Sequence, residues 1–154
     1  MIDVKEEMDK FYSLPWSARW RSAVEIDDMI GKTIVAIDGA EADSEAIIFL
    51  CNDGSRYVMY HEQDCCESVT VNDVCGDISQ LIGEPILKAE CVTNSDEPAK
   101  PDIYEAESWT WTFYHLATVK GYVTIRWYGE SNGYYSECVD LIKLVERSEL
   151  HCLS

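Results

Sequence analysis

The side chains best suited to chemistry gather in one short stretch of this sequence. The seven residues from position 61 to 67 carry an imidazole, three carboxylates and two thiols, contributed by His61, Glu62, Asp64, Cys65, Cys66 and Glu67. Such groups bind metals, transfer protons and act as nucleophiles. The 154 residues contain no glycine-rich phosphate loop, serine elbow or His-Glu-x-x-His motif. We therefore weigh this stretch by its residue types and spacing alone.

One hypothesis for this stretch is a metal site, in which His61, Cys65, Cys66 and Cys75 supply the four ligands of a tetrahedral zinc ion. The spacing argues against it. Zinc knuckles place a few residues between their cysteines, whereas adjacent cysteines on a strand point to opposite faces. We therefore expect no cofactor, with zinc as the alternative, and one of Cys65 and Cys66 buried.

A second hypothesis is a cysteine nucleophile, with His61 as its base and Asp64 or Glu67 as the orienting group. The thiolate is the reactive form, and neighbouring carboxylates raise the pKa of a thiol. The acidic surroundings therefore argue against catalysis. We expect a protein without enzymatic activity, and keep a cysteine-dependent activity as an alternative.

The charge of the chain favours a third hypothesis, recognition of a basic protein. Twelve basic and 29 acidic residues give a formal net charge of -17, which excludes direct binding to nucleic acid or to an anionic membrane. Carboxylates spaced along loops can instead imitate the phosphates of nucleic acid. The candidate interface residues are His61, Glu62, Asp64, Glu67, Asp96, Glu97, Asn132, Tyr134 and Tyr135. Further acidic candidates are Asp38, Glu41, Asp43, Glu45, Asp102, Glu105 and Glu107.

A fourth hypothesis is capture of a small ligand between aromatic strand faces. The aromatic residues concerned are Trp109, Trp111, Tyr114, Trp127 and Tyr128. Aromatic residues that alternate along strands are more often core residues. Sequestration of a small ligand therefore remains an alternative to the binding of a protein.

The hydropathy pattern changes from helical to strand spacing along the chain. Residues 3–12 and 17–30 have helical spacing, and 77–82 form a helical turn capped by Asp77. Period-two patterns predict strands at 33–38, 45–51, 55–61, 85–92, 108–119, 122–129 and 134–144, with an exposed loop at 93–107. We expect an α+β protein with a largely antiparallel sheet and short helices on one side. Residues 1–30 would form a helical segment and 31–154 a single domain.

An internal repeat suggests how these elements assemble. Aligning residues 26–38 with 78–90 matches Ile26, Ile30, Gly31 and Ile34 with Ile78, Ile82, Gly83 and Ile86. The repeat predicts a pseudo-two-fold duplication with halves at about 26–77 and 78–144. The loops at 61–67 and 129–135 would then be equivalent.

The cysteine content favours a reducing compartment. Seven is an odd number, no signal-peptide pattern opens the sequence, and no apolar run approaches the ~20 residues of a membrane helix. We expect a cytoplasmic protein. Four cysteines are then expected to be small buried or half-buried residues without disulfide partners: Cys51, Cys91, Cys138 and Cys152.

Four segments resemble a family of small uncharacterised domains encoded by bacteriophages and bacterial mobile elements: YHEQDCCESV, GDISQLIGEPILKAE, WTWTFYHLATVKGYVTIRWYG and SNGYYSE. The resemblance covers about residues 26–141. It implies a phage or bacterial setting and assigns no activity to any residue. We therefore expect a monomer or homodimer in the cytoplasm of a bacterial host. It would inhibit a basic host protein, such as a nuclease or defence complex, in the manner of anti-CRISPR proteins and nucleic-acid mimics.

Overall fold

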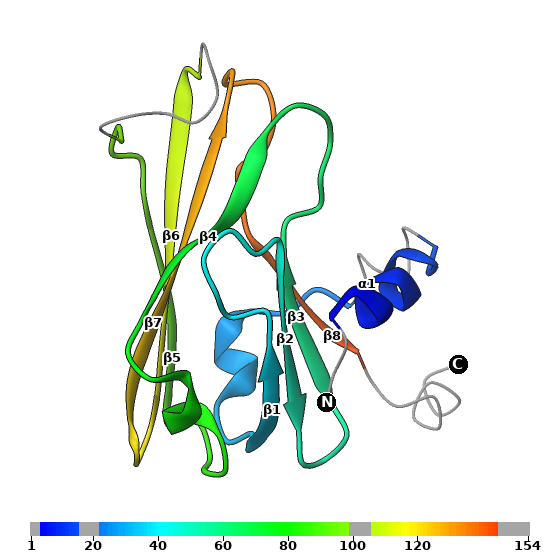
Figure 1. The fold of residues 1–154 in the computed structure, drawn as a ribbon, viewed down its shortest axis with the longest axis vertical. Helices are drawn as coiled ribbons and strands as arrows, with labels where there is room; N and C mark the ends of the chain where they lie inside the picture. Colours follow the sequence, from blue (N-terminus) through cyan, green and yellow to red (C-terminus); the bar gives the residue numbers. More distant parts are fainter. Residues whose placement is uncertain (1–3, 16–21, 99–105, 145–154) are drawn as a thin grey trace.

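The computed structural model describes residues 4–15, 22–98 and 106–144, and this part of the chain is nearly all β (Figure 1). It contains two four-stranded antiparallel sheets, with one short α-helix and two 3-10 turns. The predicted α+β class, with helices on one side of a single sheet, is therefore wrong. No helix among the described residues is long and apolar enough to cross a membrane.

The first sheet has the strand order β1-β2-β3-β8. Its strands are β1 (Ile34–Asp38), β2 (Ala46–Cys51), β3 (Arg56–Tyr60) and β8 (Asp140–Leu144). The turn after β2 places Gly54 at φ 87°, the left-handed conformation that an Asp-Gly turn supplies. The three strand predictions up to residue 61 are thus confirmed to within a residue or two.

The second sheet has the strand order β4-β7-β6-β5. Its strands are β4 (Ser68–Cys75), β5 (Lys88–Asn94), β6 (Ser108–Thr118) and β7 (Gly121–Ser131). β6 and β7 form one long hairpin that is paired along its whole length. The strand predicted at 134–144 is shorter than expected, because β8 begins only at Asp140.

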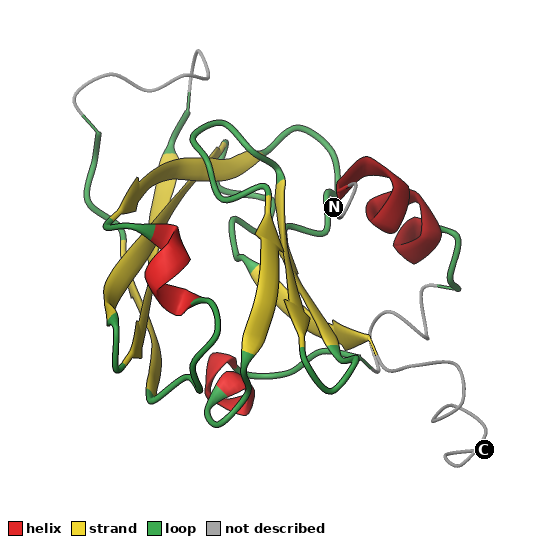
Figure 2. Cartoon of the chain, turned by 60° about the horizontal axis from the view of Figure 1, so that its bottom comes forward, coloured by secondary structure: helices red, strands yellow, loops and turns green. Residues whose placement is uncertain are grey.

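The two sheets pack face to face around one continuous core, as Figure 2 shows. Trp127 of β7 is fully buried there, and its indole Nε1 donates to Sδ of Met59 on β3 at 3.1 Å. Helix α1 (Val4–Tyr12) lies on the outer face of the first sheet. Its Phe11 packs edge-on against Tyr60 at 4.9 Å between ring centroids. This cover explains why β2 is buried on both faces.

The fourth strand of each half crosses to the other sheet. β4 follows β3 in the chain but pairs with β7, while β8 follows β7 and pairs with β3. The turns before the halves' first strands also exchange backbone hydrogen bonds, from Gly31 N–H to Ile86 O at 2.8 Å and from Gly83 N–H to Ile34 O at 2.9 Å. The duplication itself stays a prediction. It would generate this reciprocal pattern.

The second predicted helix is wrong for the residues that can be compared. Residues 16–21 lie outside the described part, and Ala23 forms an isolated bridge with Ile142 of β8. Only η1 (Ile26–Met29) is helical, and it is a 3-10 turn like η2 (Ile78–Leu81). The apolar residues of η1 that enter the core are three positions apart, which is the repeat of a 3-10 helix.

Candidate functional site

Two loops that carry the chain from one sheet to the other meet at one end of the sandwich. They are residues 61–67 between β3 and β4, and residues 132–139 between β7 and β8. His61 Nδ1 lies 2.7 Å from the carbonyl oxygen of Cys138. The Glu62 N–H donates to Oδ2 of Asp140 at 2.9 Å. The central stretch of the sequence therefore sits where both crossings come together.

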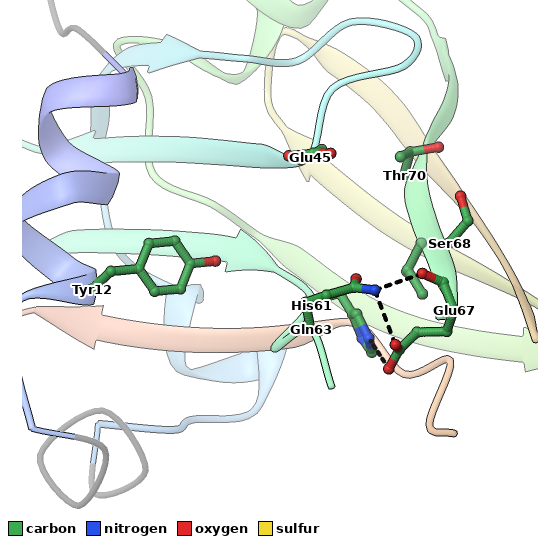
Figure 3. A pocket seen from close by; sticks show the side chains of 8 residues that line it. Tyr12, Glu45, His61, Gln63, Glu67, Ser68 and Thr70 are labelled. Carbon is green, nitrogen blue, oxygen red and sulfur yellow. Dashed lines mark hydrogen bonds and ion pairs between the residues drawn. The ribbon is translucent and has the colours of Figure 1, made fainter. Parts of the chain in front are cut away.

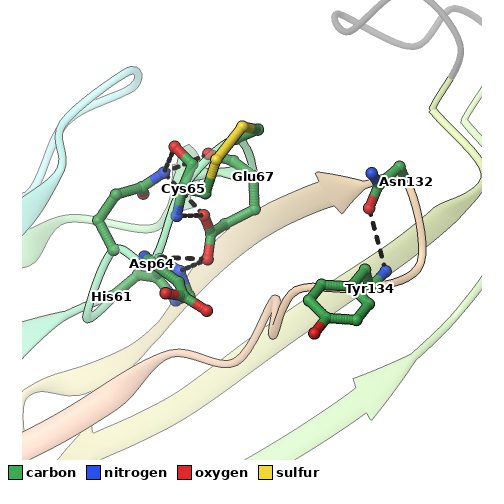
Figure 4. The surroundings of a disulfide bond; sticks show 8 residues. His61, Asp64, Cys65, Glu67, Asn132 and Tyr134 are labelled. Carbon is green, nitrogen blue, oxygen red and sulfur yellow. Dashed lines mark hydrogen bonds and ion pairs between the residues drawn. A yellow bond between two sulfur atoms is a disulfide. The ribbon is translucent and has the colours of Figure 1, made fainter.

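Glu67 closes the first of these loops from the inside (Figure 4). Its Oε1 accepts hydrogen bonds from Cys65 N–H at 2.8 Å and from Gln63 Nε2 at 2.9 Å. Its Oε2 accepts from Asp64 N–H at 3.2 Å and faces His61 Nε2 at 3.1 Å. The side chain of Glu67 is fully buried. A carboxylate with four such partners fixes the loop more firmly than the loop backbone could alone.

The ring of His61 is committed on both sides. Its Nδ1 faces a carbonyl, which only accepts, and its Nε2 faces the carboxylate of Glu67. Both ring nitrogens of His61 therefore face acceptors inside the protein. Burial by itself would raise the pKa of Glu67. The hydrogen bonds from the backbone of the loop and from His61 outweigh it and hold the pKa below its usual value. No ring nitrogen of His61 is left for a metal or for proton transfer to a substrate.

The cysteines of this loop differ from expectation. Cys65 and Cys66 form a disulfide with each other, and both are exposed. The prediction that one is buried assumed a strand, but these residues form a turn, where side chains do not alternate between faces. Cys91 and Cys138 are exposed free thiols, so their predicted burial is wrong, whereas Cys51 is buried as expected. Cys152 lies outside the described residues.

The four candidate zinc ligands are not brought together. Cys75 ends β4, whose first residue Ser68 follows the loop directly, so the eight-residue strand separates it from Cys65 and Cys66. Across residues 4–15, 22–98 and 106–144, no three His, Cys, Asp or Glu side chains are grouped as a metal site would require. The donor set at this loop therefore does not fit zinc.

Metal analysis checks this conclusion. We expect the purified protein to hold far less than one equivalent of zinc, and the Cys65→Ser/Cys66→Ser variant to hold the same amount. Elemental analysis by mass spectrometry after purification without chelators measures both. A full equivalent in the wild type that the double variant loses would contradict the geometry described here.

Exposed carboxylates gather on the loops at this same end. We call this group the acidic loop end and define it as Glu41, Asp43, Glu45, Asp64, Asp96, Glu97 and Glu107. Strand pairing brings the loops together: Ala46 pairs with Tyr60, Ser68 with Glu130, and Ser108 with Ser131. None of the seven forms an ion pair with another described residue. Asp102 and Glu105 lie outside the described part.

Two other acidic candidates are less exposed. Asp38 is half-buried, and Glu62 is half-buried and accepts a hydrogen bond from the Tyr60 hydroxyl at 2.8 Å. Together with the burial of His61 and Glu67, this divides the predicted interface residues. Some support the loop from within, and the others face solvent.

Three lysines lie at the other end of the sandwich, where each contacts a carboxylate or a backbone carbonyl. Lys32 pairs with Asp53 at 2.6 Å and Lys143 with Asp28 at 3.5 Å. Lys120 donates to the carbonyl of Ile82 at 2.7 Å. No lysine or arginine occurs in residues 39–45, 61–67, 94–98, 106–107 or 131–139. Within these described loop segments the charge is therefore of one sign.

Tyr134 is the most exposed large apolar side chain among the described residues, at 83%. Its ring meets that of Tyr135 edge-on at 5.0 Å. Asn132 Oδ1 accepts a hydrogen bond from the Tyr134 N–H at 3.1 Å, which fixes the turn (Figure 4). The two tyrosines thus lie at the loop end, and their role in an interface stays a prediction.

One structural residue was missed. Glu137 is buried in the second loop, where it accepts hydrogen bonds from Thr110 Oγ1 at 2.8 Å and Ser131 Oγ at 2.5 Å. It plays the part that Glu67 plays in the first loop. Aligning the tetrapeptide CESV at 66–69 with SECV at 136–139 would have indicated it.

The aromatic residues do not form a common ligand site. Tyr114 and Trp127 are buried. The rings of Trp111 and Tyr128 meet in a tilted arrangement, 4.6 Å between centroids, on the outer face of the second sheet, with the guanidinium of Arg126 5.6 Å from the Trp111 ring. None of them lines the pocket found at the loop end. The pocket at the loop end therefore gives no support to the small-ligand hypothesis for these aromatic residues.

These features define a nearly all-β, two-sheet domain with an acidic loop end. The chain belongs to the DUF7448 family, a domain of unknown function, whose model matches residues 27–141. This confirms, at that level, the resemblance to uncharacterised domains over about the same residues. No curated protein and no solved structure matched the chain.

A substitution tests the closing role of Glu67. We expect Glu67→Gln to lower the free energy of unfolding at pH 7 by about 1–3 kcal/mol, because the amide cannot accept all four hydrogen bonds. The lowered pKa of Glu67 gives a stabilisation that is complete above its unfolded pKa of about 4.3 and is lost as the pH falls through the folded value. The difference between wild type and variant should therefore shrink in acid.

Urea unfolding between pH 7 and pH 3 measures this difference. Glu45→Gln is the matched control, because Glu45 is exposed and should leave stability nearly unchanged. Equal stability of Glu67→Gln and wild type at pH 7 would show that the loop does not depend on this carboxylate.

Proposed function

We propose that this protein is a non-enzymatic binding protein of phage or mobile-element origin. It inhibits a basic host protein that binds nucleic acid or acts in defence. The observation that carries the proposal is the acidic loop end. Seven exposed carboxylates lie there on three loops, with no ion-pair partner among the described residues.

The charge supports a protein partner with a nucleic-acid site. A molecule with net charge -17 attracts a basic surface over a distance, and such steering speeds association. A groove built for phosphates presents lysine and arginine side chains. Carboxylates at the acidic loop end would occupy the positions of phosphates in that groove.

The rigidity of the loops supports the same function. Glu67 and Glu137 close the two crossing loops from inside, and the Asp43 N–H is bonded to the carbonyl of Val71 at 2.8 Å. Loops held in this way lose little conformational entropy on binding. Tyr134 and Tyr135 beside them would act as aromatic anchors.

The cellular setting is part of the proposal. We place the protein in the cytoplasm of a bacterial host, as a monomer or homodimer. Four of the six cysteines in the described residues are free thiols, which supports a reducing compartment; the exposed Cys65–Cys66 disulfide would be open to reduction there.

Affinity capture tests the proposal. Tagged protein is incubated with lysate of a bacterial host and washed with rising salt, and the proteins released are identified by mass spectrometry. We expect a basic nucleic-acid enzyme that leaves the column as salt increases. An empty column, or partners that are acidic and insensitive to salt, would overturn the proposal.

A further inference from the structure

A pocket of about 230 Å³ opens between helix α1 and the loop end (Figure 3). Tyr12, the last residue of α1, forms one side. Glu45, which precedes β2, forms another, and Ser68 and Thr70 of β4 form a third. Figure 3 shows these side chains, which come from α1, from the segment before β2 and from β4, around one hollow.

The floor of this pocket is the buried pair of His61 and Glu67, with Gln63 beside it. The ring nitrogens of His61 and the carboxylate oxygens of Glu67 all have partners within the two crossing loops. Gln63 donates through Nε2 to the Glu67 carboxylate at 2.9 Å and to the Glu67 carbonyl at 2.6 Å. The floor is therefore fixed and does not need a ligand to hold it.

The walls, by contrast, offer acceptors that are not used within the described structure. They are the carboxylate of Glu45, Oε1 of Gln63, and the hydroxyl oxygens of Ser68 and Thr70. None of these oxygen atoms has a hydrogen-bond partner among the described residues. A ligand that fits must donate several hydrogen bonds at once.

The charge of the surroundings selects a cation. Glu45 contributes a carboxylate, and Asp64 and Asp43 lie on the loops that border the pocket. A phosphate or carboxylate ligand would be repelled here. A guanidinium group presents five donors in one plane and can pack against an aromatic ring such as that of Tyr12. A lysine ammonium is smaller, more strongly hydrated and less suited to acceptors spread over several walls.

We propose that this pocket binds the guanidinium group of an arginine side chain that the basic partner presents. The proposal rests on the proposed function, and it adds the residue type by which the partner is recognised. In it, Glu45 forms the charge-assisted hydrogen bond to the guanidinium, while Ser68, Thr70 and Gln63 accept from its remaining donors.

Nuclear magnetic resonance titration with N-acetyl-arginine amide tests this site. We expect saturable shifts of the backbone amides of Glu45, Gln63 and residues 68–70. N-acetyl-citrulline amide has nearly the same shape without the charge, and it should cause no saturable shifts at these amides. Glu45→Gln should weaken arginine binding about tenfold, because a charge-assisted hydrogen bond is lost. Thr70→Val, which keeps the shape of the side chain, should weaken it less.

Asp64→Asn is the matched control, since it removes one negative charge outside the lining of the pocket. It should leave arginine binding nearly unchanged. Equal effects of Asp64→Asn and Glu45→Gln on arginine binding would overturn the assignment of this pocket to arginine. Equal shifts with the arginine and citrulline probes would overturn it too.

The two proposals fail separately. If capture recovers a basic partner but the arginine probe does not bind, the pocket assignment is wrong and the proposed function stands. If the probe binds in the pocket and capture recovers no partner, the pocket stands and the proposed function is wrong.

Discussion

Trp127→Ala is expected to lower the free energy of unfolding by about 3–5 kcal/mol, the largest loss that we anticipate for any single substitution. Trp127 is fully buried between the two sheets, and its indole bonds to Met59 across the core. Its removal leaves a cavity that strands of both sheets line and cannot close without moving. Because a domain of this size is stable by about 5–15 kcal/mol, the variant would lose a large part of its stability.

Urea unfolding followed by circular dichroism measures this loss. Trp111→Ala is the matched control, because Trp111 is half-buried on the outer face of the second sheet. Trp111→Ala should lower the free energy of unfolding clearly less than Trp127→Ala does. The phenylalanine of Trp127→Phe fills most of the cavity, so the loss of stability in this variant should lie between those of Trp111→Ala and Trp127→Ala. Equal losses for Trp127→Ala and Trp111→Ala would mean that the sheets are not packed on each other as described.

Neutralising four carboxylates of the acidic loop end is expected to lower the affinity of the protein for the captured partner strongly. The variant carries Glu41→Gln, Asp43→Asn, Asp64→Asn and Asp96→Asn. Each exposed charge contributes about 0.2–1 kcal/mol, so the four together should reduce affinity by between about fourfold and about 900-fold. Most of the loss should lie in the association rate and should diminish at high salt. Asparagine suits position 43, where φ is 70°.

A second variant provides the control for charge alone. It carries Asp9→Asn, Glu25→Gln, Asp27→Asn and Glu84→Gln, four neutralisations outside the acidic loop end. Both variants should unfold at nearly the wild-type temperature. Association kinetics by surface plasmon resonance compare them. Equal loss of affinity in the two variants would mean that net charge, and not the acidic loop end, attracts the partner.

The strand predictions succeeded where the apolar pattern is clear, whether one face of the strand meets the core, as in β6, or both faces are buried, as in β2. β6 alternates between buried and partly exposed residues from Thr112 to Thr118, β7 does so from Val123 to Trp127, and the sequence predicted both strands. β4 was not predicted, although Val69 and Val71 alternate there. A register shift between Val71 and Asp73 interrupts its pattern. The polar cluster before it also drew attention to chemistry and away from the strand.

The fold class could not be predicted, because it depends on which strands pair. Hydropathy indicates strands but does not show that β4 leaves β3 to join β7, or that β8 joins β3. That exchange turns one expected sheet into two. At the site, the composition singled out residues 61–67, and their role in an interface stays a prediction. The composition did not show that Glu67 lies inside and Asp64 outside, because burial there is decided by hydrogen bonds across the loop.

Competition for the captured partner tests the central claim most directly. The partner is first bound to a fluorescently labelled DNA duplex, and the protein is then added while fluorescence anisotropy is followed. The account predicts that the protein displaces the duplex, and that the four-carboxylate loop-end variant does so only at much higher concentration. A complex in which partner, duplex and protein are all bound together would contradict the claim that the acidic loop end occupies a nucleic-acid site.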